Sequence, residues 1–304
     1  MRVTQLEINR NLLSDIENLS RAFVDVNRQM SSGKKLNKLS DSPLGSADLV
    51  DITEQALRLE SYRSNITLSS YQLKSAESVL NQAYNAFVSI DTLGTNAANE
   101  TNSPEGRQSI LSEIESLREQ LISVGNTKVG GIYIFAGTDV ANKPFELVET
   151  SPGSGYYDSV YSGNQNVNSV PVSDGVEVVV GVHGQQALGA VLKKVDELIE
   201  AIKGSIDGTG SVEDIGNSLE GFGDALDELG LARGQIGVSL SMVERLSEII
   251  GDRDIVLKEQ RSNIEDANAL EVAMRISQLQ IAINAALSSG GAVLSQRTLF
   301  DIIG

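Results

Sequence analysis

The 304-residue chain contains no cysteine and no tryptophan, and it has few prolines and aromatic residues. The absence of cysteine excludes disulfides, thiolate nucleophiles and cysteine-ligated zinc. The one histidine, His183, lies in the turn-like segment "GVHGQQ" and has no partner at a spacing typical of a catalytic triad. We therefore expect no catalytic centre, no metal and no cofactor.

Long apolar runs are also missing. No segment approaches the roughly 18 consecutive apolar residues of a membrane-spanning helix. The opening "MRVTQLEINRNLLSDIENLS" lacks the apolar core and cleavage site of a secretory signal. Lys and Arg total 24 against 41 Asp and Glu, a net charge of -17. Because phosphate binding needs basic patches, the composition argues against nucleic acid as a partner.

What the sequence does contain is apolar stripes at helical spacing. The first stripe advances by alternating steps of four and three residues, which predicts a helix that buries one face against another helix: Leu12, Ile16, Leu19, Phe23, Val26 and Met30. A longer stripe holds a seven-residue spacing: Ile52, Leu59, Ile66, Leu73, Leu80 and Phe87. A third comprises Ile110, Ile114, Leu117, Leu121 and Val124.

The carboxy-terminal part repeats this pattern. One stripe comprises Ile236, Leu240, Val243, Ile250 and Leu257, and a second comprises Val272, Ile276, Leu279 and Ile283. Any single stripe is typical of an ordinary bundle core, but their combined length favours a rod. The sequence predicts a mainly α fold in which the N- and C-terminal segments form a long antiparallel helical coiled coil or bundle.

The middle of the chain has a strand-like pattern instead of helical stripes. The segment "VNSVPVSDGVEVVVGV" alternates and turns at Ser173-Asp174-Gly175 like a hairpin, and "GGIYIFAGTDVANKPF" has the pattern of a strand followed by turns. We predict a small acidic β domain over 131–187, at the far end of the rod. The helical rod then comprises 43–130 and 188–261, and the terminal arms comprise 1–42 and 262–304.

The segment "SGKKLNKLSDSPLGSADL" predicts a helix boundary. Gly33 can end the first helix, and Ser40, Asp41 or Ser42 can cap the next helix, with Pro43 in its first turn.

These segments resemble a known family. The opening 50 residues resemble the amino-terminal arm of bacterial flagellin-type axial proteins, with Ser40-Asp41-Ser42-Pro43 at the family's Ser-Asp-Asp-Pro turn and Ser42 in place of the second acid. The ending "RSNIEDANALEVAMRISQLQIAINAALSSGGAVLSQRTLFDIIG" is similar to the family's carboxy-terminal arm. One motif resembles the hook-filament junction branch, hook-associated protein 3: Gly131, Tyr133, Phe135 and Gly137, followed by Pro144 and Phe145.

The resemblance implies a structural component that joins the hook, through the first junction protein, to the flagellin filament. It also implies self-association in a ring, export through the flagellar secretion system with a cytoplasmic chaperone, and an extracellular location after a transient cytoplasmic stage. The assembly interface would comprise the first and last stripes together with Leu299, Phe300, Ile302 and Ile303. The stripe from Val272 to Ile283 is either the chaperone contact or only part of the assembled core.

Two alternatives remain at this point: a minor flagellin, or a secreted coiled-coil adhesive module that uses the acidic insertion for recognition. The arms are complementary in charge, because residues 1–40 have seven basic and four acidic side chains, whereas residues 262–304 have two basic and four acidic ones. Ordering a 40-residue arm costs more backbone entropy than its few large apolar side chains return. We therefore hypothesise that the arms are disordered or frayed in the free subunit and fold on assembly.

Overall fold

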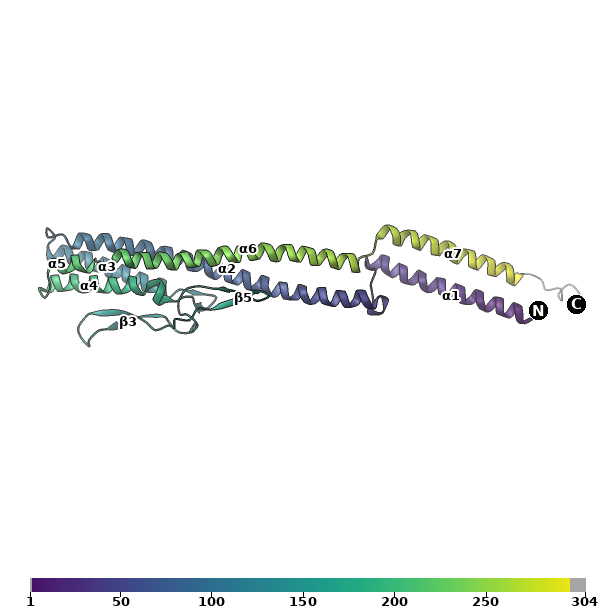
Figure 1. The fold of residues 1–304 in the computed structure, drawn as a ribbon, viewed down its shortest axis with the longest axis horizontal. Coiled ribbons are helices and arrows are strands. Elements are labelled where there is room, and N and C mark those ends of the chain that lie inside the picture. The colour runs from purple at the N-terminus through teal and green to yellow at the C-terminus, as the bar shows by residue number, and fades with distance from the viewer. Residues whose placement is uncertain (1, 296–304) are drawn as a thin grey trace, which may run out of the picture. The chain divides into compact units, whose positions relative to one another are not determined.

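The computed structural model describes residues 2–295, and it confirms a mainly α chain with a small β insertion (Figure 1). The first half contains the helices α1 (Arg2–Ser32), η1 (Leu39–Asp41), α2 (Pro43–Ala97) and α3 (Pro104–Gly125). The insertion contains the strands β1 (Lys128–Val129), β2 (Ile132–Tyr133), β3 (Phe145–Glu149), β4 (Tyr157–Tyr161), β5 (Ser169–Ser173) and β6 (Val176–Val179). The last part contains η2 (Gln185–Gly189), α4 (Ala190–Asp207), α5 (Val212–Ser218), α6 (Phe222–Glu265) and α7 (Ala269–Ser295).

The chain forms two compact units. One combines the residues up to Arg58 with those from Asp252 onward, and the other comprises Leu59–Gly251. Helices α2 and α6 each contribute to both units. The predicted arm boundaries at 42 and 262 fall inside the first unit and do not coincide with its limits. The division into arms and rod therefore stays a prediction about the assembled protein.

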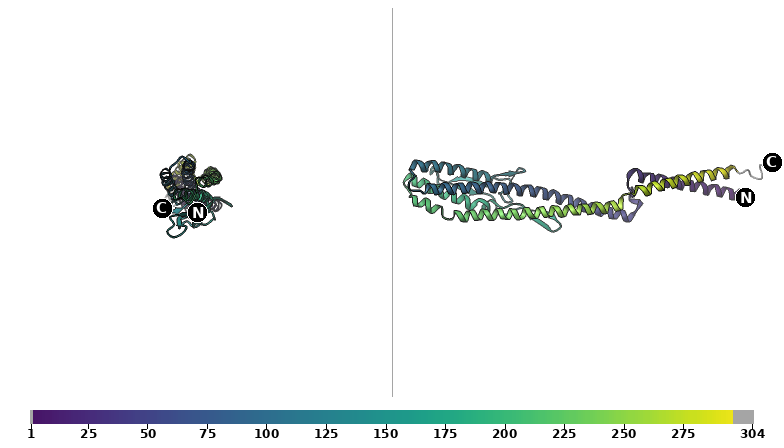
Figure 2. Two further views of the ribbon diagram at one scale, coloured as in Figure 1. Left: turned by 90° about the vertical axis from the view of Figure 1, so that its left-hand side faces the viewer. Right: turned by 90° about the horizontal axis from the view of Figure 1, so that it is seen from above.

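In the first unit, α1 and α7 lie side by side and antiparallel (Figures 1 and 2). Near one end, Gly290 faces Leu12 so closely that an added Cβ would lie 2.7 Å from Leu12 Cδ2. At the other end, the segment after α1 meets the segment before α7. Gly33 ends α1 as predicted, with a left-handed φ of 70°.

Backbone hydrogen bonds connect these two segments. The amide of Ala267 donates to the carbonyl of Gly33 (2.9 Å), and the amide of Lys35 donates to the carbonyl of Glu265 (2.6 Å). We call this pairing of residues 33–35 with 265–267 the interlock. Side chains reinforce it, because the Glu265 carboxylate accepts from Lys34 Nζ and from Arg261 Nε. These two hydrogen bonds lower the pKa of Glu265 below its ordinary value.

The start of α2 shows which predicted cap is used. The Ser42 hydroxyl accepts from the amide of Gly45 (3.2 Å), and Pro43 is the first residue of the helix. Asp41 instead accepts the amides of Asn37 and Lys38, and these bonds lower the pKa of its carboxyl. Serine in place of the usual acid therefore still caps the helix.

The second unit has a helical core that confirms the long predicted stripe. The series from Leu59 to Phe87 is buried in this unit, as are Ile236, Val243 and Ile250 on α6. Both stripes continue into the first unit, where Ile52 and Leu257 are also buried. Helix α4 contributes a dense apolar face that includes Leu192, Val195 and Leu198. The rings of Phe87 and Phe222 stack with centroids 4.8 Å apart, which joins α2 to the start of α6.

The insertion consists of three separate antiparallel pairs, β1–β2, β3–β4 and β5–β6. The predicted hairpin at Asp174-Gly175 is confirmed as β5–β6, with Gly175 at a φ of 70°. This hairpin packs along α2, where Asn65 Nδ2 donates to the carbonyl of Pro171 (2.8 Å) and the Tyr62 hydroxyl donates to Asp174 (2.8 Å).

The strand followed by turns that was predicted for this segment is present, but the strand is short. Strand β2 comprises only Ile132 and Tyr133, which follow a turn at Gly130 and Gly131 with positive φ, and the chain then proceeds through further turns. Phe135 is nevertheless fully buried, and its carbonyl accepts from the amide of Gly184 (2.7 Å) and from the hydroxyl of Tyr161 (3.0 Å). Turns, rather than sheet alternation, direct this ring into the core.

The interlock predicts a dependence of stability on pH. Since the pKa of Glu265 is lowered in the folded state, its contribution is present above the ordinary value of 4.5 and is lost as pH falls through the folded pKa. Glu265→Gln should therefore lower the free energy of unfolding at pH 7 but have a shrinking effect below about pH 4.5. Urea titrations of both proteins from pH 7 to pH 3 measure this difference. A difference in the free energy of unfolding that stays constant from pH 7 to pH 3 would contradict a stabilising role for the Glu265 carboxylate.

Gly137 provides a second prediction. It adopts a φ of 70°, and an added Cβ would lie 2.3 Å from the carbonyl oxygen of Asn164, whereas Gly153 has a φ of 81° and open space around it. Gly153→Ala should cost about 1 to 2 kcal/mol from backbone strain alone. Gly137→Ala should cost at least about 2 kcal/mol more, because backbone atoms must also move. Urea unfolding followed by tyrosine fluorescence compares the two, and equal costs would refute the close contact.

Candidate assembly surface

The two terminal stripes face each other in the first unit. Val26 on α1 and Val272 on α7 are buried, while the other stripe residues are half-buried between the helices: Leu12, Ile16, Leu19, Phe23, Ile276, Leu279 and Ile283. Met30 differs, because it is exposed. Leu299, Phe300, Ile302 and Ile303, which complete the predicted assembly interface, lie outside the described residues.

Both terminal helices also carry apolar side chains on the side away from this contact. On α1, Leu13 and Val24 are 61% and 62% exposed, and on α7, Leu270 and Ile281 are 70% and 66% exposed. We call these positions, together with Met274 and Leu287, the outer faces of α1 and α7. Large exposed apolar side chains on two adjacent helices mark a surface that a partner can cover.

The outer faces were missed by the sequence reasoning, which assigned one stripe to each arm. The signal was present in α7, where "ALEVAMRISQLQIAINAAL" is apolar around most of the helix rather than along one stripe. A helix with this composition is typical of one that packs against partners on more than one side.

The residues of the predicted family motifs lie in two places. Ser40 is exposed, Asp41 accepts backbone amides at the start of η1, and Pro43 is the first residue of α2. These residues form the turn described above. In the second unit, Phe135, Pro144 and Phe145 are buried, and the half-buried Tyr161 has its ring centroid 5.2 Å from that of Phe145. Gly131 and Tyr133 lie nearer the surface, where Lys128 Nζ is 4.4 Å from the Tyr133 ring centroid.

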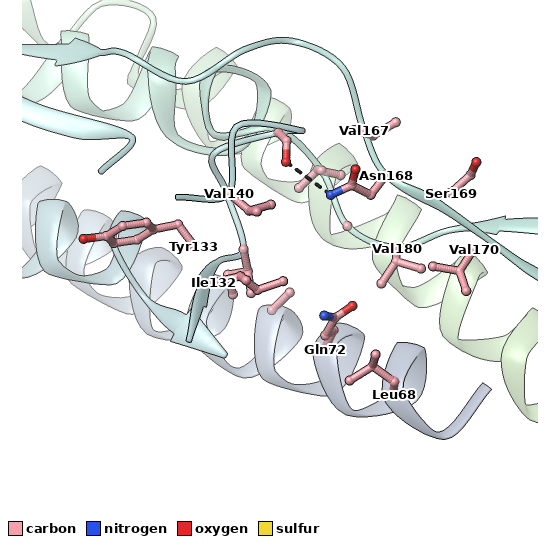
Figure 3. A pocket seen from close by; sticks show the side chains of 15 residues that line it. Leu68, Gln72, Ile132, Tyr133, Val140, Val167, Asn168, Ser169, Val170 and Val180 are labelled. Carbon is pink, nitrogen blue, oxygen red and sulfur yellow. Dashed lines mark hydrogen bonds between the residues drawn. The ribbon is translucent and has the colours of Figure 1, made fainter. Parts of the chain in front are cut away.

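A hollow of about 250 Å³ lies between α2 and this motif (Figure 3). Leu68 and Gln72 line it from α2, and Ile132, Val140 and Val180 line it from the insertion. Asn168 Nδ2 donates to the carbonyl of Gly137 (3.4 Å) at its rim (Figure 3). The lining contains no ionisable side chain apart from Tyr133, so this hollow offers packing rather than acid-base chemistry.

Asn126 makes a contact that sequence reasoning missed. Its carboxamide accepts from the amide of Phe145 (3.0 Å) and donates to the carbonyl of the same residue (2.9 Å). This side chain therefore satisfies both outward backbone groups of Phe145, as a neighbouring strand would. The sequence signal was only an asparagine after the last glycine of α3.

Arg118 and Asp196 form a second unpredicted contact. Their side chains are almost fully buried, and Arg118 Nη1 lies 3.1 Å from Asp196 Oδ1. Arg118 also donates to the carbonyl of Tyr157 (3.2 Å), and Asp196 accepts the amide of Ser159 (2.7 Å). Burial raises the pKa of Asp196, because desolvation outweighs these hydrogen bonds. The pair attaches β4 to α3 and α4.

His183 has a structural contact in the described protein. Its Nδ1 accepts from the amide of Gln186 (3.2 Å) at the start of η2, and burial lowers its pKa. Within residues 2–295, no cluster of three or more His, Cys, Asp or Glu side chains could hold a metal ion. None of the described helices is both long and apolar enough to span a membrane.

Several known proteins are similar to this chain in sequence. Residues 3–139 match the family described as the bacterial flagellin N-terminal helical region. Flagellar hook-associated protein 3 of Salmonella typhimurium is 25% identical, over 94% of this chain and 94% of that protein. The protein of the same name from Escherichia coli is 31% identical over 143 residues, which are 47% of this chain and 45% of that protein.

A solved structure supports the same relationship at the level of the fold. A putative flagellar hook-associated protein from Vibrio parahaemolyticus superposes with a TM-score of 0.64 at 20% identity, over 74% of this chain and 100% of that chain. The amino-terminal family match, the nearly full-length relative and the shared fold agree with the motifs at residues 40–43 and 131–145. The chain is therefore similar in sequence to hook-associated protein 3 over nearly its full length, and its amino-terminal part matches the flagellin family.

Proposed function

We propose that this protein is a structural subunit of the bacterial flagellum that joins the hook to the flagellin filament. The observation that carries the proposal is the match to a hook-associated protein 3 over 94% of both chains. A match of that extent includes the terminal helices and the insertion alike, so it is not limited to the arms that flagellins share.

The proposed role is structural rather than enzymatic. The relatives described above are named as flagellar hook-associated proteins, and several polar side chains that could suggest chemistry have structural contacts in the described residues. Arg118 and Asp196 hold β4, His183 accepts a backbone amide, and Glu265 supports the interlock. Each of these groups is explained by a contact within the fold.

The outer faces of α1 and α7 are the proposed assembly surface. Neighbouring subunits and the adjacent axial proteins would cover side chains such as Leu13 and Ile281, which the α1–α7 pair alone leaves exposed. Covering them adds about 1.5 to 3 kcal/mol for each large apolar side chain. This gain supports the hypothesis that the arms become fully ordered only on assembly, in a ring of copies between the first junction protein and flagellin.

The chaperone contact is also a proposal. The stripe from Val272 to Ile283 faces α1 in the folded chain, so a chaperone that binds this stripe would compete with α1. A chaperone of this kind would keep the arms apart until export. The outer face of α7 is the alternative contact, because it is accessible while the arms are paired.

The two alternative functions are less favoured. A minor flagellin would be expected to match flagellins over its full length, whereas the nearly full-length relative described above is named hook-associated protein 3. An adhesive module would depend on the acidic insertion, so deletion of about residues 146–186 would abolish its function. A junction protein should still permit filament growth after that deletion if the helices carry assembly.

A deletion strain tests the proposed function. Removal of the gene should leave hooks intact while flagellin is released into the medium, because the filament loses its attachment. Electron microscopy of the cells and quantification of extracellular flagellin measure this result. Reintroducing the wild-type gene serves as the control, and normal filaments in the deletion strain would refute the junction role.

The assembly surface generates a separate prediction. Ile281→Glu places a charge on the exposed outer face of α7, so it should change the free energy of unfolding of the isolated protein by no more than about 0.5 kcal/mol. The same substitution should prevent the variant from restoring filaments in the deletion strain, because a neighbour would have to bury the carboxylate. Circular dichroism and the complementation assay give the two measurements.

Ile283→Glu is the matched control, because Ile283 lies on the same helix but is half-buried toward α1. This variant should also weaken the pairing that remains between the frayed arms of the isolated chain, so its arms should be cleaved faster than those of the wild type. Limited proteolysis of the dilute protein reports on the arms directly, and early cleavage within 1–40 and 262–304 is expected. Normal filaments with Ile281→Glu, or arms of the dilute wild type that resist protease, would contradict the proposed coupling.

A further inference from the structure

The two longer hairpins of the insertion, β3–β4 and β5–β6, are each only two strands wide, so each has two outer edges. In an antiparallel pair, alternate residues direct their backbone N–H and C=O groups toward the partner strand or away from it. An edge whose outward groups have no partner can accept an additional strand. The four edges differ in whether side chains from outside the hairpin bind their outward backbone groups.

Side chains from outside the hairpins bind outward backbone groups on three of these edges. On β4, the outward amide of Ser159 and the outward carbonyl of Tyr157 are bound by Asp196 and Arg118. On β5, Pro171 has no N–H to offer, and its carbonyl accepts from Asn65 on α2. Asn126 closes the base of β3 by binding both groups of Phe145.

The edge of β6 is different. Pairing of Val178 with Val170, and the bond from the amide of Val180 to the carbonyl of Asn168, turn the backbone of Glu177 and Val179 outward. Within residues 2–295, the hydrogen bonds outside the hairpin include none to the backbone N–H or C=O of these two residues. This edge is therefore open.

A hollow of about 630 Å³ adjoins the open edge. Val179 and Gly181 line it from the insertion, and Gly230, Leu231, Gly234 and Val238 line it from α6. Leu231 and Val238 are 67% and 70% exposed, and the lining contains no charged side chain. An added strand would thus have backbone groups to pair with and an apolar space for its side chains.

Charge indicates the chemistry of the occupant. Glu177 lies two residues before Val179 on β6, and Asp227 lies one helical turn before Leu231 on α6, so carboxylates flank an uncharged hollow. Residues 131–187 contain six acidic side chains and one lysine, a net charge of -5. Basic residues at the ends of a bound segment would complement this surface.

We propose that β6 accepts an extended peptide segment of another protein as an added strand, with small or apolar side chains over the α6 hollow and a basic residue at each end. Main-chain hydrogen bonds to Glu177 and Val179 would fix the strand, and the hollow would select its central side chains. This contact is distinct from the assembly surface on α1 and α7 and does not depend on the junction role.

A synthetic peptide tests the proposal on the full chain. Fluorescein-labelled Lys-Thr-Val-Ser-Val-Thr-Lys should give a saturable rise in fluorescence anisotropy when the protein is added. Gly234→Leu fills the hollow from the helix side, where an added Cβ meets no atom within 4 Å, and it should weaken binding at least tenfold. Gly251→Leu is the matched control on α6, equally open but outside the hollow, and should bind as the wild type does.

Modified peptides test the mode of binding. N-methylation of alternate residues blocks one edge of the peptide, so one methylation register should lose at least tenfold in affinity and the other should bind normally. Replacement of both lysines by glutamate should also weaken binding severalfold. Equal binding of both methylated peptides, no saturable binding at all, or a dimer of the wild type that Gly234→Leu dissociates would overturn the proposal.

Discussion

The interlock between residues 33–35 and 265–267 is the constraint on which the pairing of the terminal helices depends. Two antiparallel amphipathic helices can slide past each other by a heptad with little change in which side chains meet. The backbone bonds from Ala267 to Gly33 and from Lys35 to Glu265 exclude such shifts, because each donor has one acceptor. Leu12 then lies against Gly290 near the other end, and the outer faces of α1 and α7 stay turned away from the contact.

Much of the helical architecture could be predicted from the sequence. The seven-residue series from Ile52 to Phe87 specified the buried face of α2, and Gly33 and Pro43 marked the ends of helices correctly. These features are periodic or depend on neighbouring residues, so a sequence displays them directly. The hairpin at Gly175 was predictable for the same reason.

The remaining features depend on single contacts between distant segments. The bond between Arg118 and Asp196 joins residues 78 positions apart, and nothing in either helix distinguishes them from solvated charges. Phe135 is fully buried although it lies in a turn rather than in a strand, and its carbonyl accepts from the hydroxyl of Tyr161, a contact that the local sequence does not display. The outer faces of the arms were missed because a single stripe per helix was assumed.

The same contacts explain how three small strand pairs remain attached to a helical protein. A two-stranded hairpin is marginally stable in water by itself. Here Asn126, Asp196 and Asn65 supply from the helices some of the hydrogen bonds that further strands would provide in a larger sheet. The insertion is therefore stabilised by the bundle rather than by a sheet of its own.

The entry and exit of the insertion lie close together. An added Cβ on Gly125 would lie 2.6 Å from the Phe145 ring and 3.1 Å from Leu188, so the end of α3, the start of β3 and η2 converge on one point. A segment whose two ends are neighbours can be lengthened or exchanged without moving the helices that carry it. The insertion thus has the properties of an exchangeable cassette, through which evolution can alter the outer surface of the protein while the helical scaffold stays constant.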